Sequence, residues 1–201
     1  MPTHKPCEGI LSKKQNIIQA ATRLFAEQGF EGTSTLQIAN EAVVTEPLIY
    51  YHFKGKDDLF SHILETSFKA YFSRLEALER EPGTPFQRIK ALLDFHLRFA
   101  EEMPDETTIG VSVCPAKLKD PEHICTINIQ RQRKRLKAYL TDCLKKGIKS
   151  GEFNRVPVPE TVHLLIAMIN GLTRQKGLYL KEKDGMRDVT VEFCRRSFVK
   201  N

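Results

Sequence analysis

Residues 43–56, VVTEPLIYYHFKGK, bring together side chains that suit contacts with a nucleic acid. Tyr50, Tyr51 and His52 place three hydrogen-bonding rings on consecutive residues, and two lysines follow shortly after. Such groups can reach the edges of bases and the phosphates of a duplex. Packing against a neighbouring helix would explain one of these rings but not all three, because Phe53 is also available for the core. The segment therefore predicts a surface that contacts DNA.

The surrounding sequence predicts two short helices joined by a tight turn, which is a helix-turn-helix. The first, about 34–42, opens with Ser-Thr-Leu-Gln, the capping-box pattern of a helix start. The second, about 46–52, follows the N-cap residue Thr45 and carries Pro47 in its first turn, where a missing N–H costs little. With its apolar residues facing inward, the second helix leaves these side chains for bases and phosphates: Glu46, Pro47, Tyr50, Tyr51 and His52. Lys54 and Lys56 lie near the amino end of the next helix, where N–H groups and ammonium groups together favour phosphate.

The remaining pattern is helical almost throughout, so the expected fold class is all-α with about nine helices. Apolar residues recur at helical spacing in a first helix that begins at a Ser-Lys-Lys-Gln capping box and stops at Gly29. We expect a three-helix DNA-binding domain over residues 1–55 and a second domain of bundled helices over residues 56–201. The turn EPGTP, residues 81–85, also suits a domain boundary. The expected later helices are 56–78, 86–103, 122–150, 159–180 and 185–199, with a short helix flanked by loops, or a strand, in 104–121.

Composition is that of an ordinary globular protein, with 201 residues, 41% hydrophobic and 28% charged. The net charge is +6, but residues 1–60 hold six Lys and Arg against seven Asp and Glu, a balance of −1. Any DNA contact must therefore come from well-placed cations and not from bulk charge. The N-terminus has no apolar signal region, and the longest apolar run, residues 162–172, is too short to span a bilayer. We expect a cytoplasmic protein that does not enter a membrane.

Five cysteines are scattered along the chain without a CxxC spacing, which favours free thiols in a reducing compartment. Cys114, directly before a proline, is open to interpretation as a redox sensor. His4 and Cys7 have no second pair of ligands near them, so no metal site is predicted. No cofactor is expected.

The segment TSTLQIANEAVVTEPLIYYHFKGKDDLF, residues 33–60, resembles the signature of the TetR family of transcription factors. The likeness extends upstream through IIQAATRLFAEQGFEGTS, residues 17–34, and continues faintly in residues 147–172. It implies a DNA-binding transcriptional regulator, in most relatives a repressor that a small-molecule effector releases from its operator. It also implies a homodimer on a pseudo-palindromic DNA site. The operator, the effector and the regulated genes stay open.

The resemblance also assigns roles to individual residues. The positions that touch DNA in relatives are matched by Thr33, Ser34, Thr45, Tyr50, Tyr51, His52 and Lys56. Glu46 and Pro47 occupy the variable positions that select bases, and a carboxylate there could accept a hydrogen bond from cytosine. Val43 and Pro47 stand where the family commonly has glycine, and a β-branched residue at positive φ is costly.

The larger domain supplies two further expectations. Apolar residues with a few polar groups suit an effector pocket, and its candidates are Phe95, His96, Phe99, Met103 and Cys114, each of which could equally be core. A dimer interface on the last two helices would use Leu165, Ile166, Ile169, Leu172, Val189 and Phe193. His96 is expected to be a satisfied core histidine. The basic run RQRKRLK, residues 131–137, is interpreted as a solvated helix face, although an acidic effector could use one of its arginines.

Two other functions are consistent with parts of the sequence. One is a DNA-binding structural protein of the same fold without an effector, which a pocket filled by side chains would favour. The other is a thiol enzyme that uses Cys114 with His123, but no third orienting residue or nucleophile motif supports it. The enzyme hypothesis is therefore the weakest of the three.

Overall fold

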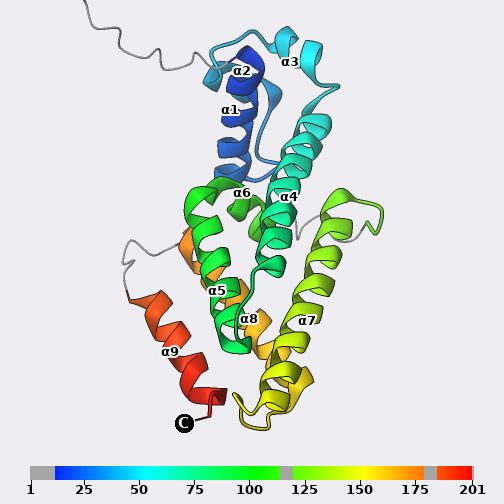
Figure 1. Cartoon of the computed structure of the whole chain (residues 1–201). Helices are drawn as coiled ribbons and strands as arrows, with labels where there is room; N and C mark the ends of the chain where they lie inside the picture. The colour runs from blue at the N-terminus through cyan, green and yellow to red at the C-terminus, as the bar shows by residue number, and fades with distance from the viewer. Residues whose placement is uncertain (1–11, 114–119, 179–184, 201) are drawn as a thin grey trace, which may run out of the picture. The chain divides into compact units, whose positions relative to one another are not determined.

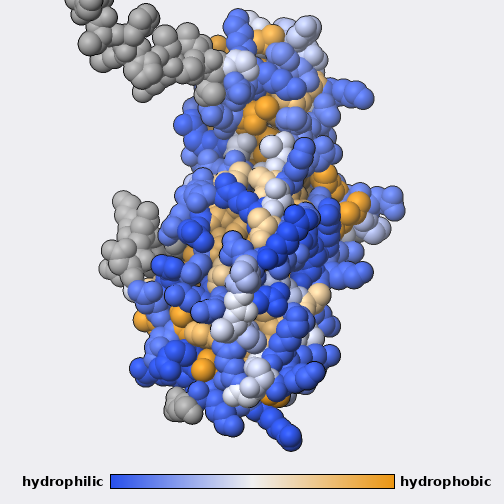
Figure 2. Space-filling model, in the orientation of Figure 1, coloured by the Kyte–Doolittle hydropathy of each residue, from blue (hydrophilic) through white to orange (hydrophobic). Residues whose placement is uncertain are grey.

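A computed structural model describes residues 12–113, 120–178 and 185–200 (Figure 1). Over these residues the chain forms nine α-helices and one π-helical turn, with no strand beyond an isolated antiparallel bridge between Phe153 and Val199. The expectation of an all-α fold is confirmed. None of the described helices is long and apolar enough to cross a bilayer. The face shown in Figure 2 is mostly hydrophilic, with small apolar patches among charged side chains.

The chain divides into two compact units, residues 1–63 and 64–201. The division falls inside α4 (Lys56–Arg80), whereas the sequence placed it before this helix. Residues 81–85, which the sequence also suggested as a domain boundary, lie within the second unit.

The first unit holds α1 (Lys13–Gln28), α2 (Thr35–Glu41), α3 (Glu46–His52) and the start of α4. Both predicted capping boxes are present, at Ser12 and at Ser34. The core of this unit contains three aromatic rings, which pack with centroids 4.9 to 5.6 Å apart: Phe25, Phe30 and Phe60. Aromatic contacts of this kind add to the stabilisation from burial alone, so these rings join α1, the loop before α2 and α4.

The second unit holds the rest of α4 with α5 (Pro85–Glu102), α6 (Pro104–Thr108), the π-helical turn η1 (Ile109–Val113), α7 (Ile124–Ser150), α8 (Val158–Leu178) and α9 (Met186–Phe198). The ends of the five longer helices, α4, α5, α7, α8 and α9, lie within two residues of their predicted positions, because amphipathic stripes and caps mark them. The region from 104 is helical and not a strand up to residue 113. Its core is a single cluster of apolar side chains from α4, α5, α7, α8 and α9.

The short link between α7 and α8 fastens three helices of the second unit together. The Glu152 carboxylate accepts hydrogen bonds from the Thr84 hydroxyl (2.7 Å) and the Phe86 N–H (3.2 Å), at the start of α5. The ring of Phe153 packs edge-on against Phe198 at 5.1 Å, and the Asn154 N–H donates to the Phe198 carbonyl. This link therefore positions α9 as well as α5.

An ion pair inside the second unit adds a second tie to α9. Asp94 on α5 is buried, and its two carboxylate oxygens accept from Nε and Nη2 of Arg187, both at 2.7 Å. Because a buried carboxylate without a partner is costly, this two-pronged pair fixes the start of α9 against α5.

The cysteines are not all free, contrary to the expectation. Cys143 and Cys194 are free and buried, and burial raises the pKa of each thiol to about 11, so both are protonated at neutral pH. Cys125 is buried and disulfide-bonded. The spacing of cysteines along the chain could not indicate this bond, because pairing depends on the distance between residues in the fold. Cys7, Cys114 and His4 lie outside the described residues, within which no cluster of His, Cys, Asp and Glu could hold a metal.

Gly147 on α7 is the position where the packing of Phe153 leaves no room for a side chain. A Cβ there would lie 2.1 Å from the Phe153 ring. We expect Gly147→Ala to lower the free energy of unfolding by about 2 kcal/mol, since overpacking must displace the ring. Gly171→Ala is the matched control, because no atom lies within 4 Å of its Cβ position. Urea denaturation of both variants tests this, and a Gly147→Ala protein as stable as Gly171→Ala would contradict it.

Candidate nucleic-acid interface and ligand cavity

The helix-turn-helix is held by a small buried contact and by polar contacts of Thr35, whose hydroxyl also lies 3.5 Å from the Tyr50 hydroxyl. Ile38, Ala39 and Ile49 are almost fully buried where α2 and α3 cross. The Thr35 hydroxyl, at the start of α2, donates to the Glu46 carboxylate at the start of α3, with 2.6 Å between the oxygens. The sequence reasoning missed Thr35, because its role depends on a partner eleven residues away.

The outer side of α3 carries the polar and aromatic residues that the sequence assigned to it. Tyr50 is 55% exposed and Tyr51 80% exposed, and Pro47 is also exposed. His52 is half-buried and contacts Tyr51 edge-on at 5.0 Å. Large rings rarely lie this open without a partner, so the exposure of both tyrosines indicates a contact surface.

The hydroxyl of Thr45 makes no cap hydrogen bond, although Thr45 is the N-cap of α3 as predicted. Ser34 does cap α2: its Oγ accepts from the Gln37 N–H at 3.2 Å, which leaves its own O–H free to donate. Both residues are exposed. Each can therefore offer a hydroxyl donor to an anion beside a helix N-terminus.

Thr33 and Lys56, which the sequence assigned to DNA contact, both make hydrogen bonds inside the first unit. The Thr33 side chain is buried and donates to the carbonyls of Leu24 (3.2 Å) and Gly29 (2.8 Å). The ammonium of Lys56 donates to the carbonyls of Phe30 and Thr33, both at 2.8 Å, and lies 4.4 Å from the centre of the Phe30 ring. Two of the three ammonium donors are therefore used inside the unit, and at most one is left for phosphate.

Lys54 is exposed, as expected for a phosphate contact. Its backbone N–H donates to the Asp58 carboxylate at 2.9 Å, which fixes the chain just before α4. The Lys54 ammonium itself makes no hydrogen bond or ion pair with the described residues, so it is a cation next to α3 that is available for a phosphate.

Val43, in the turn between α2 and α3, adopts a φ of 53° and is 90% exposed. The turn has therefore kept the left-handed geometry that glycine would favour, and the chain bears the strain of a β-branched residue there. Its side chain gains nothing from burial that could offset this strain.

Replacing Val43 by a residue that tolerates positive φ should stabilise the protein. We expect Val43→Asn to raise the free energy of unfolding by about 1 kcal/mol. Val43→Gly should gain less, since glycine loses more entropy on folding. Val43→Ala keeps a Cβ and serves as the comparison variant. Thermal and urea unfolding measure the order Asn, Gly, Ala, and an asparagine variant no more stable than the wild type would contradict the strain.

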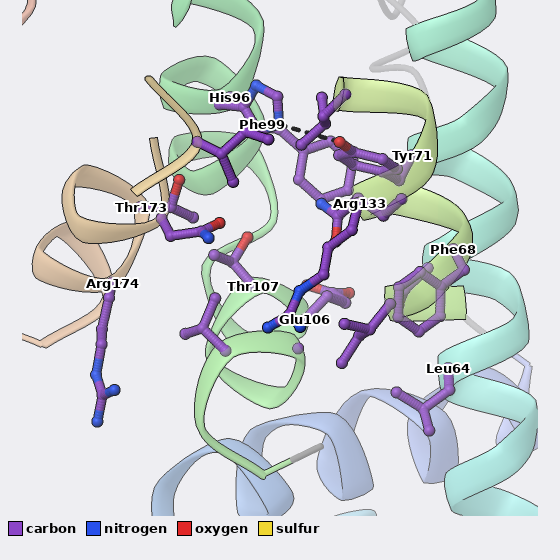
Figure 3. Close-up of a pocket in the computed structure, with 18 residues that line it drawn as sticks. Leu64, Phe68, Tyr71, His96, Phe99, Glu106, Thr107, Arg133, Thr173 and Arg174 are labelled. Carbon is purple, nitrogen blue, oxygen red and sulfur yellow. Dashed lines mark hydrogen bonds between the residues drawn. The ribbon is translucent and has the colours of Figure 1, made fainter. Parts of the chain in front are cut away.

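A cavity of about 310 Å³ lies within the second unit, between α4, α5, α6, α7 and α8 (Figure 3). Its apolar wall includes Leu64, Phe68, Phe99, Leu136 and Ile166. Its volume is at the lower end of the roughly 300 to 1,000 Å³ that is usual for small-molecule sites. The cavity is therefore large enough for a small ligand.

A chain of hydrogen bonds closes one end of the cavity. Nδ1 of His96 lies 2.8 Å from the Leu92 carbonyl, which can only accept, so Nδ1 carries the proton. Nε2 then accepts from the Tyr71 hydroxyl at 3.0 Å (Figure 3). Burial lowers the pKa of His96 to about 4, so the ring is neutral at physiological pH. His96 is a satisfied core histidine, as predicted, and it also lines the cavity.

The structure brings only part of the predicted pocket together. His96 and Phe99 line the cavity, whereas Phe95 is buried in the core and Met103 is not part of the wall. Cys114 lies outside the described residues. The sequence reasoning missed the charged lining residues Glu106, Arg133 and Arg174. Arg133 belongs to the run interpreted as a solvated face, and only the packing of α7 beside α4 and α8 makes it a wall residue.

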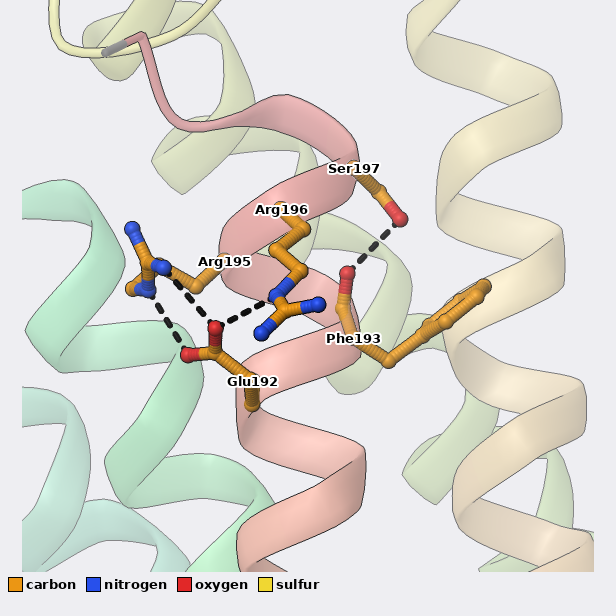
Figure 4. Close-up of polar contacts among 5 residues, drawn as sticks. All are labelled: Glu192, Phe193, Arg195, Arg196 and Ser197. Carbon is orange, nitrogen blue, oxygen red and sulfur yellow. Dashed lines mark hydrogen bonds and ion pairs between the residues drawn. The ribbon is translucent and has the colours of Figure 1, made fainter.

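The predicted dimer surface is also partly core. Leu165 and Ile169 are buried within the unit, and Ile166 lines the cavity, so these three are turned away from the surface. Val189 and Phe193 are 64% and 57% exposed. The sequence missed Leu164, 61% exposed on α8, because a helical stripe alone does not reveal which side faces inward. In Figure 4 the Phe193 ring points away from the ion pairs that Glu192 forms with Arg195 and Arg196.

The neutral state of His96 gives folding a defined pH dependence. The unfolded chain takes up a proton at the ordinary pKa of 6.5, whereas the folded chain does so only near 4. The contribution of neutral His96 to the free energy of unfolding is thus complete above pH 6.5. It is lost as the pH falls toward 4, by about 3 kcal/mol in all. His96→Gln should remove this slope, whereas the exposed His163→Gln should keep it. Urea unfolding from pH 7 to 4 and an NMR titration of His96 test this; an imidazole that titrates near 6.5 would contradict it.

Comparison with known proteins agrees with this geometry. The helix pair α2–α3 makes the chain a helix-turn-helix protein, and residues 17–63 match the family model of bacterial regulatory proteins of the tetR family. The regulator AcrR of Shigella flexneri is 42% identical over 81 residues, which are 40% of this chain and 38% of that protein. A TetR/AcrR family regulator of known structure from Thermobifida fusca is 27% identical, covers 92% of this chain and 94% of its own, and has a TM-score of 0.61. Residues 17–63 are therefore similar to the DNA-binding domain of the tetR-family regulators, and the chain spans 38% of the length of AcrR in this match.

A further solved structure with the same fold is a complex of a regulator with a small molecule and operator DNA. AibR in complex with isovaleryl coenzyme A and operator DNA has a TM-score of 0.72 and 16% identity, covering 90% of this chain and 97% of that chain. The sequence match to AcrR spans less than half of that protein. The family-model match lies within the first unit, residues 17–63, and the solved structures compare the whole fold.

Proposed function

We propose that the protein is a homodimeric transcriptional repressor that binds a pseudo-palindromic DNA operator and leaves it when a small molecule occupies the cavity of the second unit. The observation that carries this proposal is the exposure of Tyr50 and Tyr51 on α3, within the residues that match the tetR-family model. A protein with this role works where the chromosome lies, which supports a cytoplasmic location.

In the proposed complex α3 enters the major groove with its N-terminal end toward the bases. Tyr50, Tyr51 and the free hydroxyls of Ser34 and Thr45 contact phosphates and sugars, which fixes the register without reading sequence. Glu46 has one carboxylate oxygen engaged by Thr35, and the other oxygen can accept from a cytosine amino group. Thr35 therefore acts as a positioning residue for base selection.

The dimer in this proposal forms through the outer faces of α8 and α9. Leu164, Val189 and Phe193 are exposed apolar side chains on these two helices, and the flanking ion pairs of Glu192 supply a polar rim. A two-fold axis would place two recognition helices about one turn of DNA apart, roughly 34 Å.

Release by a ligand requires that the ligand bind the operator-free conformation more tightly than the operator-bound one. AibR is named as a complex with isovaleryl coenzyme A and operator DNA, which supports a similar pairing of partners here. The cavity of about 310 Å³ supports an effector over the alternative of a purely structural DNA-binding protein. The relatives named as transcriptional regulators favour a regulator over an enzyme.

Operator binding tests the proposal with DNA that flanks the gene of this protein, by fluorescence anisotropy. Tyr50→Ala should weaken binding about tenfold on every sequence bound, since it removes a backbone contact. Glu46→Gln should change which sequence is preferred, because an amide can donate where a carboxylate only accepts. Thr35→Val should shift the preference in the same direction as Glu46→Gln, whereas Glu65→Gln, an exposed carboxylate on α4, is the control.

Two outcomes would contradict the proposal. One is the absence of any DNA fragment bound more tightly than random duplex, with the protein folded and helical by circular dichroism. The other is unchanged affinity in both Tyr50→Ala and Tyr51→Ala, which would remove α3 from the interface.

A further inference from the structure

We propose that the cavity of the second unit binds an anionic amphiphile, with its apolar body against the aromatic wall and its acid group at the guanidinium of Arg133. This inference rests on the proposed function, since it names the chemical class of the effector. Three observations support it: Arg133 lines the cavity, an unpaired buried hydroxyl belongs to the same lining, and the lining is largely apolar with a positive balance of charge.

Arg133 differs from the neighbouring arginines on α7 in having no partner among the described residues. Arg131 lies over the ring of Phe72 at 4.4 Å, and Arg135 forms an ion pair with Glu79. Arg133 lines the cavity, and Figure 3 shows its side chain extending from α7 across the space toward α6. Arg133 is an exposed residue of this lining, and its guanidinium, with five donors and no acceptor, is suited to a carboxylate or a phosphate.

Thr107 on α6 supplies an independent observation. Its side chain is only 7% exposed, and its Oγ1 is buried without a hydrogen-bond partner among the described residues. Such a group costs free energy until it is satisfied. Thr107 lines the same cavity and lies near the centre of the lining in Figure 3. A ligand with acceptor oxygens would give this hydroxyl the partner that the protein does not provide.

The charges of the lining favour an anion over a cation. The charged lining residues described are Arg133, Arg174 and Glu106, a balance of +1, since His96 is neutral. Glu106 is the group that could recruit a cation instead. Burial, and to a smaller extent the nearby Asp105, raise the pKa of Glu106, so its carboxyl is more readily protonated and can then donate to the ligand.

The apolar wall indicates the rest of the ligand. Phe68, Phe99, Leu64, Leu136 and Ile166 present rings and branched chains, and the volume of about 310 Å³ suits a compact body such as a medium-length acyl chain. The acid group could be a free carboxylate or the phosphates of an acyl thioester of a nucleotide. Both share the same anionic amphiphile chemistry, and binding measurements can separate them.

Isothermal titration calorimetry of the full-length protein without DNA tests the inference. The probes are octanoate, octanoyl-coenzyme A, octanol and octyltrimethylammonium, which share one chain length and differ in charge. We expect octanoate or octanoyl-coenzyme A to bind at least tenfold more tightly than octanol, and the cation more weakly still. Preference for octanoate assigns a free acid, and preference for the thioester assigns the nucleotide form. Equal or tighter binding of the alcohol or the cation overturns the proposal.

Matched variants locate the acid group. Arg133→Gln should weaken the preferred anion about tenfold, corresponding to the loss of one charged hydrogen bond. Arg98→Gln removes the same charge from an exposed residue of α5 outside the cavity and should have no effect. Glu106→Gln should leave the anion bound as tightly or more tightly, whereas a cation site would lose affinity. If Arg133→Gln and Arg98→Gln lowered the affinity for the anion equally, the effect would come from the overall charge of the protein, and the assignment to Arg133 would be overturned.

Thr107→Val separates a ligand role from a packing role. The change removes an unsatisfied hydroxyl at nearly constant volume, so the Tm of the free protein should rise while the affinity for the anion falls severalfold. A raised Tm with unchanged affinity would exclude Thr107 from the site. Calorimetry is done without DNA, so its failure would overturn this inference and would not bear on operator binding. Absence of operator binding by the wild type would instead count against the proposed function.

Discussion

The arrangement of the first unit depends on two hydrogen bonds that the Lys56 ammonium donates to the carbonyls of Phe30 and Thr33. They join the first turn of α4 to the loop that leads into α2, across 26 and 23 residues of chain. Thr33 completes the arrangement by donating from the same loop to the carbonyls at the end of α1. With the three packed phenylalanines beneath, the loop has little freedom. The result is a rigid platform on which α2 and α3 can hold one orientation.

The exposed face of α3 is in turn arranged by contacts that do not belong to it. Thr35 orients Glu46, and the buried residues of the α2–α3 crossing leave the tyrosines outside. Val43 keeps a strained backbone at the turn without any compensating burial. Strain that persists at such a place is commonly linked to function, and here it preserves the turn geometry that sets the angle between the two helices.

The second unit combines a dense core with a partly polar cavity. Its core is continuous from α4 to α9, and the links at Glu152 and Asp94 tie α9 to α5. The cavity lies beside this core and contains a neutral histidine, an unpaired hydroxyl and an unpaired guanidinium. Close packing elsewhere makes the unpaired Thr107 hydroxyl significant, because a protein interior normally satisfies such a group. A ligand that gives this hydroxyl a partner gains affinity from a group that the free protein leaves unmatched.

The sequence by itself determined the helices, their caps and the helix-turn-helix, because these depend on spacing and on residues within a few positions of one another. Capping boxes at Ser12 and Ser34, apolar stripes and turn residues act over three or four residues. Only the tertiary structure decided which side chains are engaged inside the protein and which are free to bind a partner. Thr33 and Lys56 are engaged inside the first unit, and Leu165 and Ile169 are core, whereas Arg133 lines a cavity. The Lys56 contacts, the core positions and the cavity wall depend on partners brought close by packing over long stretches of chain, and periodicity carries no information about such distances.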